Sequence, residues 1–185
     1  KQKKLKAPIW FAFLLCPFFF VFNNHAKSHH KIDELLESAN SIRSSDPSKY
    51  SKLIDQLSSQ KEIMTSQQSY YLDYLVAYQL TYIGKTKKAT NKLLSTLSSE
   101  ANSLSKFRAR LTVVNIYAIE QNWASGLTQL SIALKQLPKI NSHSAKVNGI
   151  AVAAIFYNQI GQYNLGLTYA NKLIKAASKQ RTVCM

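Results

Sequence analysis

The sequence predicts an all-α fold, in which an N-terminal membrane anchor helix precedes a short right-handed solenoid of about four helical pairs. With only five Gly and four Pro in 185 residues, the chain lacks the tight turns of a sandwich or barrel. Apolar residues recur at helical spacing from residue 32 onward. Small residues that allow two helices to approach closely recur at Ala89, Gly126 and Gly166, which predicts a repeated unit.

The first 24 residues have the pattern of a signal anchor. Lys1, Lys3, Lys4 and Lys6 precede the uncharged segment 7–22, which holds six of the eight Phe. A helix of this length spans ~24 Å of a ~30 Å hydrocarbon core, and the flanking polar residues can make up the difference. The pattern favours an uncleaved anchor and leaves a cleaved signal as the alternative. The basic end then stays in the cytoplasm and the rest is exported.

Residues 25–31 are predicted to be a juxtamembrane linker. His25 and His29 are four residues apart and would share one face of a helix, as zinc ligands can. Neither a Cys nor a carboxylate accompanies them before Asp33. The sequence therefore predicts no metal site.

The repeat domain is predicted over residues 32–180, and its first pair begins at Ile32. Asp33, Glu34 and Glu37 would lie early in this helix, where the helix dipole favours acids. Asp46 is the expected N-cap of the next helix, with Pro47 in its first turn. The polar run 66–69 interrupts the apolar pattern, so the following helix is expected from residue 70.

Three further pairs follow, each a helix, a turn and a second helix. The first has helix 70–83, a turn at Gly84 and a helix from about Ala89. The second has helix 109–120, a turn at 121–122 and helix 123–138. The third covers 152–174 with its turn at Gly161. This order of small and aromatic residues is similar to tetratricopeptide repeats, whose usual length is ~34 residues. Spacings of 37 and 40 residues between Ala89, Gly126 and Gly166 predict longer loops, at 98–105 and 139–144.

In a repeat of this kind, the first helix of each pair lines the concave side. Polar and aromatic residues on that face could hold a peptide, a protein segment or a small ligand. The alternative is that the tyrosines pack in the core with wetted hydroxyls. The candidate groove residues are Tyr71, Tyr74, Tyr78, Arg108, Asn115, Asn148 and Asn158.

The net charge of +15 does not indicate a nucleic-acid-binding protein. Residues 1–31 hold six Lys and no acid, and no acidic residue follows Glu120. The cations are dispersed at helix-surface spacing without Arg clusters or an aromatic stacking platform, so no nucleic-acid partner is expected. No phosphate-binding loop, dinucleotide fingerprint, zinc signature or nucleophile elbow occurs. We therefore expect no catalytic residue and no cofactor in this chain.

Four segments together resemble a known family. They are IRSSDPSKYSKLIDQL, SYYLDYLVAYQLTYIGKTKKA, SKFRARLTVVNIYAI and AAIFYNQIGQYNLGLTYANKLI. The combination is similar to the N-terminal sensory region of membrane-bound bacterial GGDEF proteins, the diguanylate cyclases. The resemblance implies a bacterial inner-membrane protein with a periplasmic repeat domain and a possible homodimer. It also implies a cytoplasmic GGDEF domain, with Mg and GTP, that makes cyclic di-GMP. The GGDEF motif itself does not occur in this chain.

Two functions follow from these expectations. In the first, the repeats sense an unknown periplasmic peptide, protein or small ligand and alter the output of an attached cyclase. In the second, they form a membrane-tethered or secreted scaffold that holds a partner protein without enzymatic output. In the sensory module and in the tethered form of the scaffold, the membrane is a partner through residues 7–22.

Overall fold

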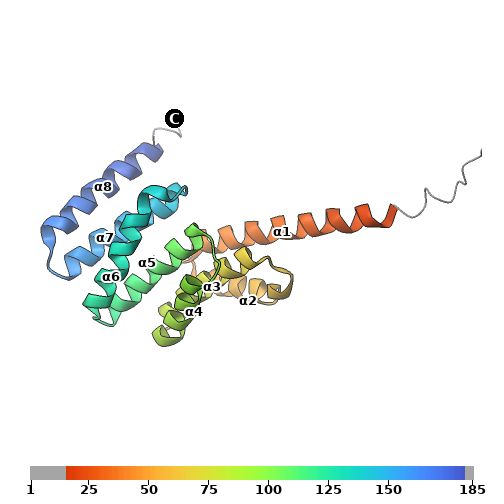
Figure 1. Cartoon of the computed structure of the whole chain (residues 1–185), viewed down its shortest axis with the longest axis horizontal. Coiled ribbons are helices and arrows are strands. Elements are labelled where there is room, and N and C mark those ends of the chain that lie inside the picture. The colour runs from red at the N-terminus through yellow and green to blue at the C-terminus, as the bar shows by residue number, and fades with distance from the viewer. Residues whose placement is uncertain (1–15, 182–185) are drawn as a thin grey trace, which may run out of the picture.

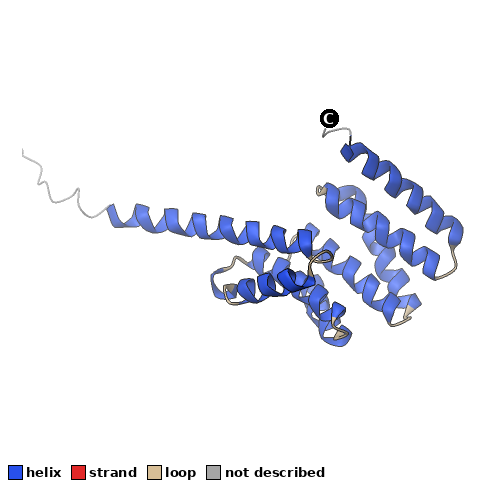
Figure 2. Cartoon of the chain, turned by 180° about the vertical axis from the view of Figure 1, so that it is seen from behind, coloured by secondary structure: helices blue, strands red, loops and turns tan. Residues whose placement is uncertain are grey.

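The computed structural model describes residues 16–181, and all regular structure within them is helical (Figure 2). The predicted all-α class is therefore confirmed. The α-helices of this part of the chain are α1 Cys16–Ile42, α2 Pro47–Ser58, α3 Ser66–Tyr82, α4 Thr86–Ser98, α5 Ser103–Ile119, α6 Trp123–Gln136, α7 His143–Gln159 and α8 Tyr163–Arg181. Two short 3₁₀ helices, η2 Lys61–Ile63 and η3 Leu137–Lys139, follow α2 and α6.

The helices pack as four consecutive pairs, α1–α2, α3–α4, α5–α6 and α7–α8. The first helices of neighbouring pairs also contact one another, so that α1, α3, α5 and α7 form a continuous layer. The second helix of a pair contacts the first helix of the next, as α4 does with α5. This arrangement is consistent with an α-solenoid. Figure 1 shows the pairs following one another, while the first part of α1 extends away from them.

Helix α1 begins much earlier than the apolar pattern predicts. It starts at Cys16 rather than near Ile32, and the expected linker 25–31 is part of it. Asp33 and Glu37 therefore lie in the second half of the helix and not in its first turn. No Gly or Pro occurs between residues 18 and 42, so nothing in the backbone stops the helix.

The predicted anchor, 7–22, lies mostly outside the described residues, because the description begins at residue 16. Within residues 16–181, no helix combines the length and the apolar composition that a membrane span requires.

The starts of α2 and α3 show how capping defines the pairs. Asp46 accepts a hydrogen bond from the Lys49 amide (2.9 Å), and Pro47 occupies the first turn, so the predicted cap is confirmed. The predicted interruption at 66–69 is wrong, since these residues form the first turn of α3. Thr65 and Gln68 form a reciprocal capping box there, which satisfies two amide groups that a helix start leaves free.

Three turns share one backbone geometry, and they define the repeat. Gly84 and Gly161 have φ of +76°, and Gln121 has φ of +55° at the equivalent position. In each turn the next amide donates to the carbonyl five residues earlier at 2.8 Å, which closes a Schellman motif. The three bonds are Lys85 N to Leu80 O, Asn122 N to Tyr117 O and Gln162 N to Tyr157 O.

Close helix contact occurs at the predicted small residues. A Cβ atom on Gly126 would lie 2.6 Å from a ring atom of Phe156 on α7. A Cβ on Gly166 would lie 3.3 Å from the Ala154 carbonyl oxygen within its own pair. Ala89 is completely buried. Small side chains at these positions therefore let the helices approach.

Helix α5 joins two hydrophobic cores. Ala109, Val113 and Ile116 pack with α1–α4, whereas its other buried face packs with α6 and α7. That second face carries Phe107, Leu111 and Val114. A helix buried on both sides shows little amphipathic pattern, in contrast to a surface helix with one apolar stripe.

We expect Gln121→Gly to stabilise the fold. Gln121 occupies the left-handed region, which costs a side-chain-bearing residue ~1–2 kcal/mol, and Gly loses part of this gain through the entropy of the unfolded chain. The net gain in the free energy of unfolding should be about 0.5–1 kcal/mol, measured by urea denaturation. Gln121→Ala keeps the strain and serves as the control. A glycine variant no more stable than the alanine variant would contradict this account.

Candidate functional site

A concave site lined almost entirely by polar side chains lies between α1, α3 and α5. It is a hollow of about 410 Å³, within the size range of small-ligand pockets. We call it the α1–α3–α5 hollow. Its lining residues are His29, Asp33, Glu37, Thr65, Gln67, Gln68, Tyr71, Asn102, Leu104, Ser105 and Arg108.

Two helix starts position this hollow. Thr65 caps α3, and Asn102 caps α5 by accepting from the Ser105 amide at 2.8 Å. Gln67 ties the two starts together, because its side-chain oxygen accepts from the Asn102 amide at 2.9 Å and its nitrogen donates to the Glu100 carbonyl at 3.3 Å. The floor of the hollow is therefore held by hydrogen bonds that span more than 30 residues of sequence, as between Gln67 and Asn102 (35 residues apart).

Gln68 fastens α1 across the hollow. It is nearly buried, and its side-chain nitrogen donates to the His29 carbonyl (2.9 Å) and to Asp33 Oδ1 (2.8 Å). Its side-chain oxygen accepts from the Thr65 amide (3.0 Å) and lies 3.2 Å from His29 Nδ1. The two donors of the Gln68 amide group thus fix α1 against the start of α3, while its oxygen completes the cap at Thr65.

Arg108 is the one Lys or Arg side chain among the residues that line the hollow. The residue is 8% exposed, and its guanidinium carbon lies 4.2 Å from the centre of the Tyr71 ring. Its nearest carboxylate oxygen is on the largely exposed Glu37, at 3.7 Å, beyond ordinary hydrogen-bonding distance. The cation is therefore held by a ring face and a distant carboxylate, and its donors are not used in a close bidentate pair.

Tyr71 presents a buried hydroxyl beside this cation. Its oxygen has no hydrogen-bond partner among the described residues. Burial raises the pKa of the Tyr71 hydroxyl above its usual range; the Arg108 guanidinium opposes this rise, and the nearby Glu37 carboxylate adds to it. Glu37 is close enough to raise the pKa of the Tyr71 hydroxyl, although the contact does not meet the geometry of a hydrogen bond. The hydroxyl thus remains a neutral, unused donor.

The structure brings together only part of the predicted groove. Tyr71 and Arg108 meet at the hollow, whereas Tyr74 is 3% exposed and stacks on Tyr71 inside the core, with ring centres 6.1 Å apart. Tyr78 is half-buried, between Arg43 and the edge of the Tyr50 ring. The remaining three predicted residues lie elsewhere: Asn115 is exposed on α5, Asn148 is half-buried on α7 and Asn158 lines a different hollow between α7 and α8.

Several residues of the hollow were not predicted as site residues. Asp33 and Glu37 come from α1, whose position against α3 and α5 depends on contacts remote in sequence. Gln68 could have been found from the capping-box spacing Thr65-x-x-Gln68, and Asn102 from its place before a helical run. Among the side chains that the structure describes, there is no group of three or more His, Cys, Asp or Glu that could hold a metal ion.

The buried tyrosines should make stability depend on pH in the alkaline range. Burial raises the pKa of Tyr50, Tyr71 and Tyr74 above the ordinary value of 10.0. The unfolded chain releases these protons above about pH 10 while the folded chain keeps them, so the free energy of unfolding falls as pH rises. Each such tyrosine contributes a slope of up to ~1.4 kcal/mol per pH unit. Urea denaturation between pH 9 and 11 should show a shallower decline for Tyr50→Phe than for the wild type, and parallel curves would contradict it.

No protein-family model matches this chain, and no curated protein or solved structure matches it. The chemistry of the α1–α3–α5 hollow is therefore the most direct guide to function.

Proposed function

We propose that this chain is a ligand-binding helical-repeat module and that its α1–α3–α5 hollow takes a small zwitterion of the amino-acid class. The observation that carries the proposal is Arg108, a buried cation that faces a hollow of ligand size and makes no close side-chain hydrogen bond to any described residue. A buried charge is costly unless it is well paired. A ligand carboxylate would supply the bidentate partner that Glu37 does not provide.

The carboxylates that α1 contributes to the hollow favour a positively charged group on the same ligand. Asp33 and Glu37 line the hollow from α1, and among the residues that the structure describes Asp33 accepts one hydrogen bond, from Gln68. An ammonium group could use the remaining acceptor sites of these carboxylates. Cation and carboxylates face one hollow, so a zwitterion complements both walls where a simple anion would face repulsion from α1.

A thermal-shift titration tests the proposal. Alanine, glutamine and glutamate are the probes, and acetate and ethylamine represent the two halves of the zwitterion. We expect at least one amino acid to raise the Tm with saturation, because a ligand that binds only the folded state stabilises it. Acetate and ethylamine should give little or no shift at equal concentration.

Arg108→Gln should abolish this response, or weaken it at least about tenfold, because it removes the charge that pairs with the carboxylate. Arg43→Gln is the matched control, since Arg43 also stacks on a tyrosine ring but does not line the hollow. A response that survives Arg108→Gln, or one lost equally in both variants, would contradict the proposed site.

We place this module in a membrane-anchored bacterial signalling protein. Support comes from the basic and then apolar start of the sequence, with residues 7–22 as the anchor, and from the resemblance to the sensory regions of diguanylate cyclases. The repeats would form a right-handed tetratricopeptide-like solenoid in the periplasm. Ligand binding would alter an attached output only if the ligand has different affinities for two arrangements of the module. Mg, GTP and the synthesis of cyclic di-GMP belong to that attached domain, outside this chain.

A reporter fusion tests this placement. Alkaline phosphatase is active only after export, so a fusion after Lys31 should be active in a bacterial host and should fractionate with the membrane. Replacing Phe18, Phe19 and Phe20 by Asp should abolish the activity, since charges within the apolar segment oppose insertion. An active fusion found in the soluble periplasmic fraction would indicate a cleaved signal. An inactive fusion, in which the reporter stays in the cytoplasm, would contradict the placement.

A scaffold without enzymatic output is the second candidate. The observation that favours it is the apolar face left open by α7 and α8, where Ile155, Leu167 and Ile174 are all more than half exposed. Exposed apolar patches of this kind mark protein-interaction sites.

A further inference from the structure

The last helix carries an apolar stripe with coiled-coil spacing. Tyr163, Leu167, Ala170, Ile174 and Ala177 are separated by four, three, four and three residues and so lie on one narrow face of α8. Tyr163 is 67% exposed, Leu167 62% and Ile174 67%. Beside this stripe lies a hollow of about 510 Å³ that includes Ala154, Ile155 and Gly166. We call this surface the α7–α8 end face.

The equivalent stripe on α6, in the preceding pair, is covered by another helix. Forty residues earlier, Trp123, Leu127 and Leu130 occupy the same positions on α6. Trp123 and Leu127 are only 37% exposed, and Leu130 is fully buried. The covering element is α7, whose Phe156 packs over Gly126 and meets the Trp123 ring edge-on at 6.1 Å. A helix is therefore the shape that fits this face.

We propose that the α7–α8 end face binds a second copy of this chain, with α8 paired antiparallel against α8 of the partner. We place the two-fold axis between Thr168 and Tyr169. The large side chain of Leu167 then lies opposite the small side chain of Ala170 of the other copy, and Tyr163 lies opposite Ile174. Such alternation of large and small side chains suits close packing of helices, and an isologous contact requires a self-complementary surface.

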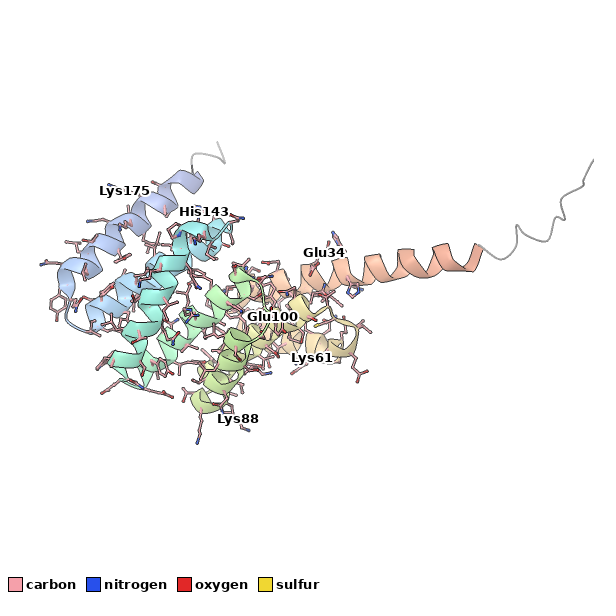
Figure 3. All side chains as sticks on the ribbon, in the orientation of Figure 1. Glu34, Lys61, Lys88, Glu100, His143 and Lys175 are labelled. Carbon is pink, nitrogen blue, oxygen red and sulfur yellow. The ribbon has the colours of Figure 1, made fainter. Side chains whose placement is uncertain are left out.

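Charge selects the antiparallel direction. The first half of α8, residues 163–171, has no charged side chain, whereas Lys172, Lys175 and Lys179 lie in the second half. Figure 3 shows Lys175 on the second half of the helix. A parallel pair would set these lysines alongside those of the partner, and like charges in apposition oppose binding. An antiparallel pair sets them beside the uncharged half.

Sedimentation velocity of the full chain in mild detergent tests the association. We expect a dimer whose dissociation constant is weakened at least about tenfold by Leu167→Glu, which buries a charge in the seam. Leu165→Glu is the matched control, because Leu165 is also exposed on α8 but lies off the stripe. Circular dichroism should show equal helix content in both variants, since both positions are on the surface. A monomer at all concentrations, or equal effects of the two variants, would overturn the proposal.

Cross-linking tests the direction. In a background with Cys16 and Cys184 changed to Ser, one preparation carries Leu167→Cys and another Ala170→Cys. Mild oxidation should give a disulfide-linked dimer in the mixture, at least about fivefold more than in either preparation alone, since only the antiparallel pair sets position 167 against position 170. Dimers formed equally by each preparation alone would indicate parallel helices and would overturn the arrangement. If no sample forms a cross-link, the end face does not bind a second copy of this chain, and the proposal is overturned.

Discussion

The two-sided burial of α5 is the constraint on which the rest of the molecule depends. One face of α5 completes the core of α1–α4 and the other completes the core of α6 and α7. No residue of the stretch 104–114 in α5 is exposed, and Arg108 is therefore buried together with its charge. Helix α1 places the Glu37 carboxylate near Arg108. The distance between the two groups is too large for a close ion pair, so space is left between them.

The hollow is polar and the end face is apolar because of where each lies in the array of helix pairs. The hollow lies between helices that pack together, and the end face lies on the last pair. At the hollow, α1, α3 and α5 lie together. The side chains of Gln67 and Gln68 form hydrogen bonds there that link the start of α3 to the start of α5 and to α1. At the end face, a pair ends with its apolar stripe uncovered. The two surfaces share no residue, so the proposed small ligand and the proposed partner helix would not compete for the same side chains.

The sequence predicts local features of this fold well and remote ones poorly. The Asp46 cap, the glycine turns and the small residues at Gly126 and Gly166 follow from spacing alone, because each depends on neighbours within a few turns. The early start of α1 could not be predicted from the sequence, because apolar residues do not recur at helical spacing in the segment before Ile32. The meeting of Glu37 with Arg108 depends on how α1 crosses α5, which no local pattern encodes.

The three Schellman turns have a consequence for how the repeat can change. Their common feature is a left-handed backbone angle and one amide-to-carbonyl bond, and Gln121 shows that a side chain other than hydrogen is accepted there. The unit that recurs in this chain is thus defined by geometry and not by residue type. Substitution can erase the likeness between two copies of the unit while the angle between their helices, and hence the curvature of the whole array, stays the same.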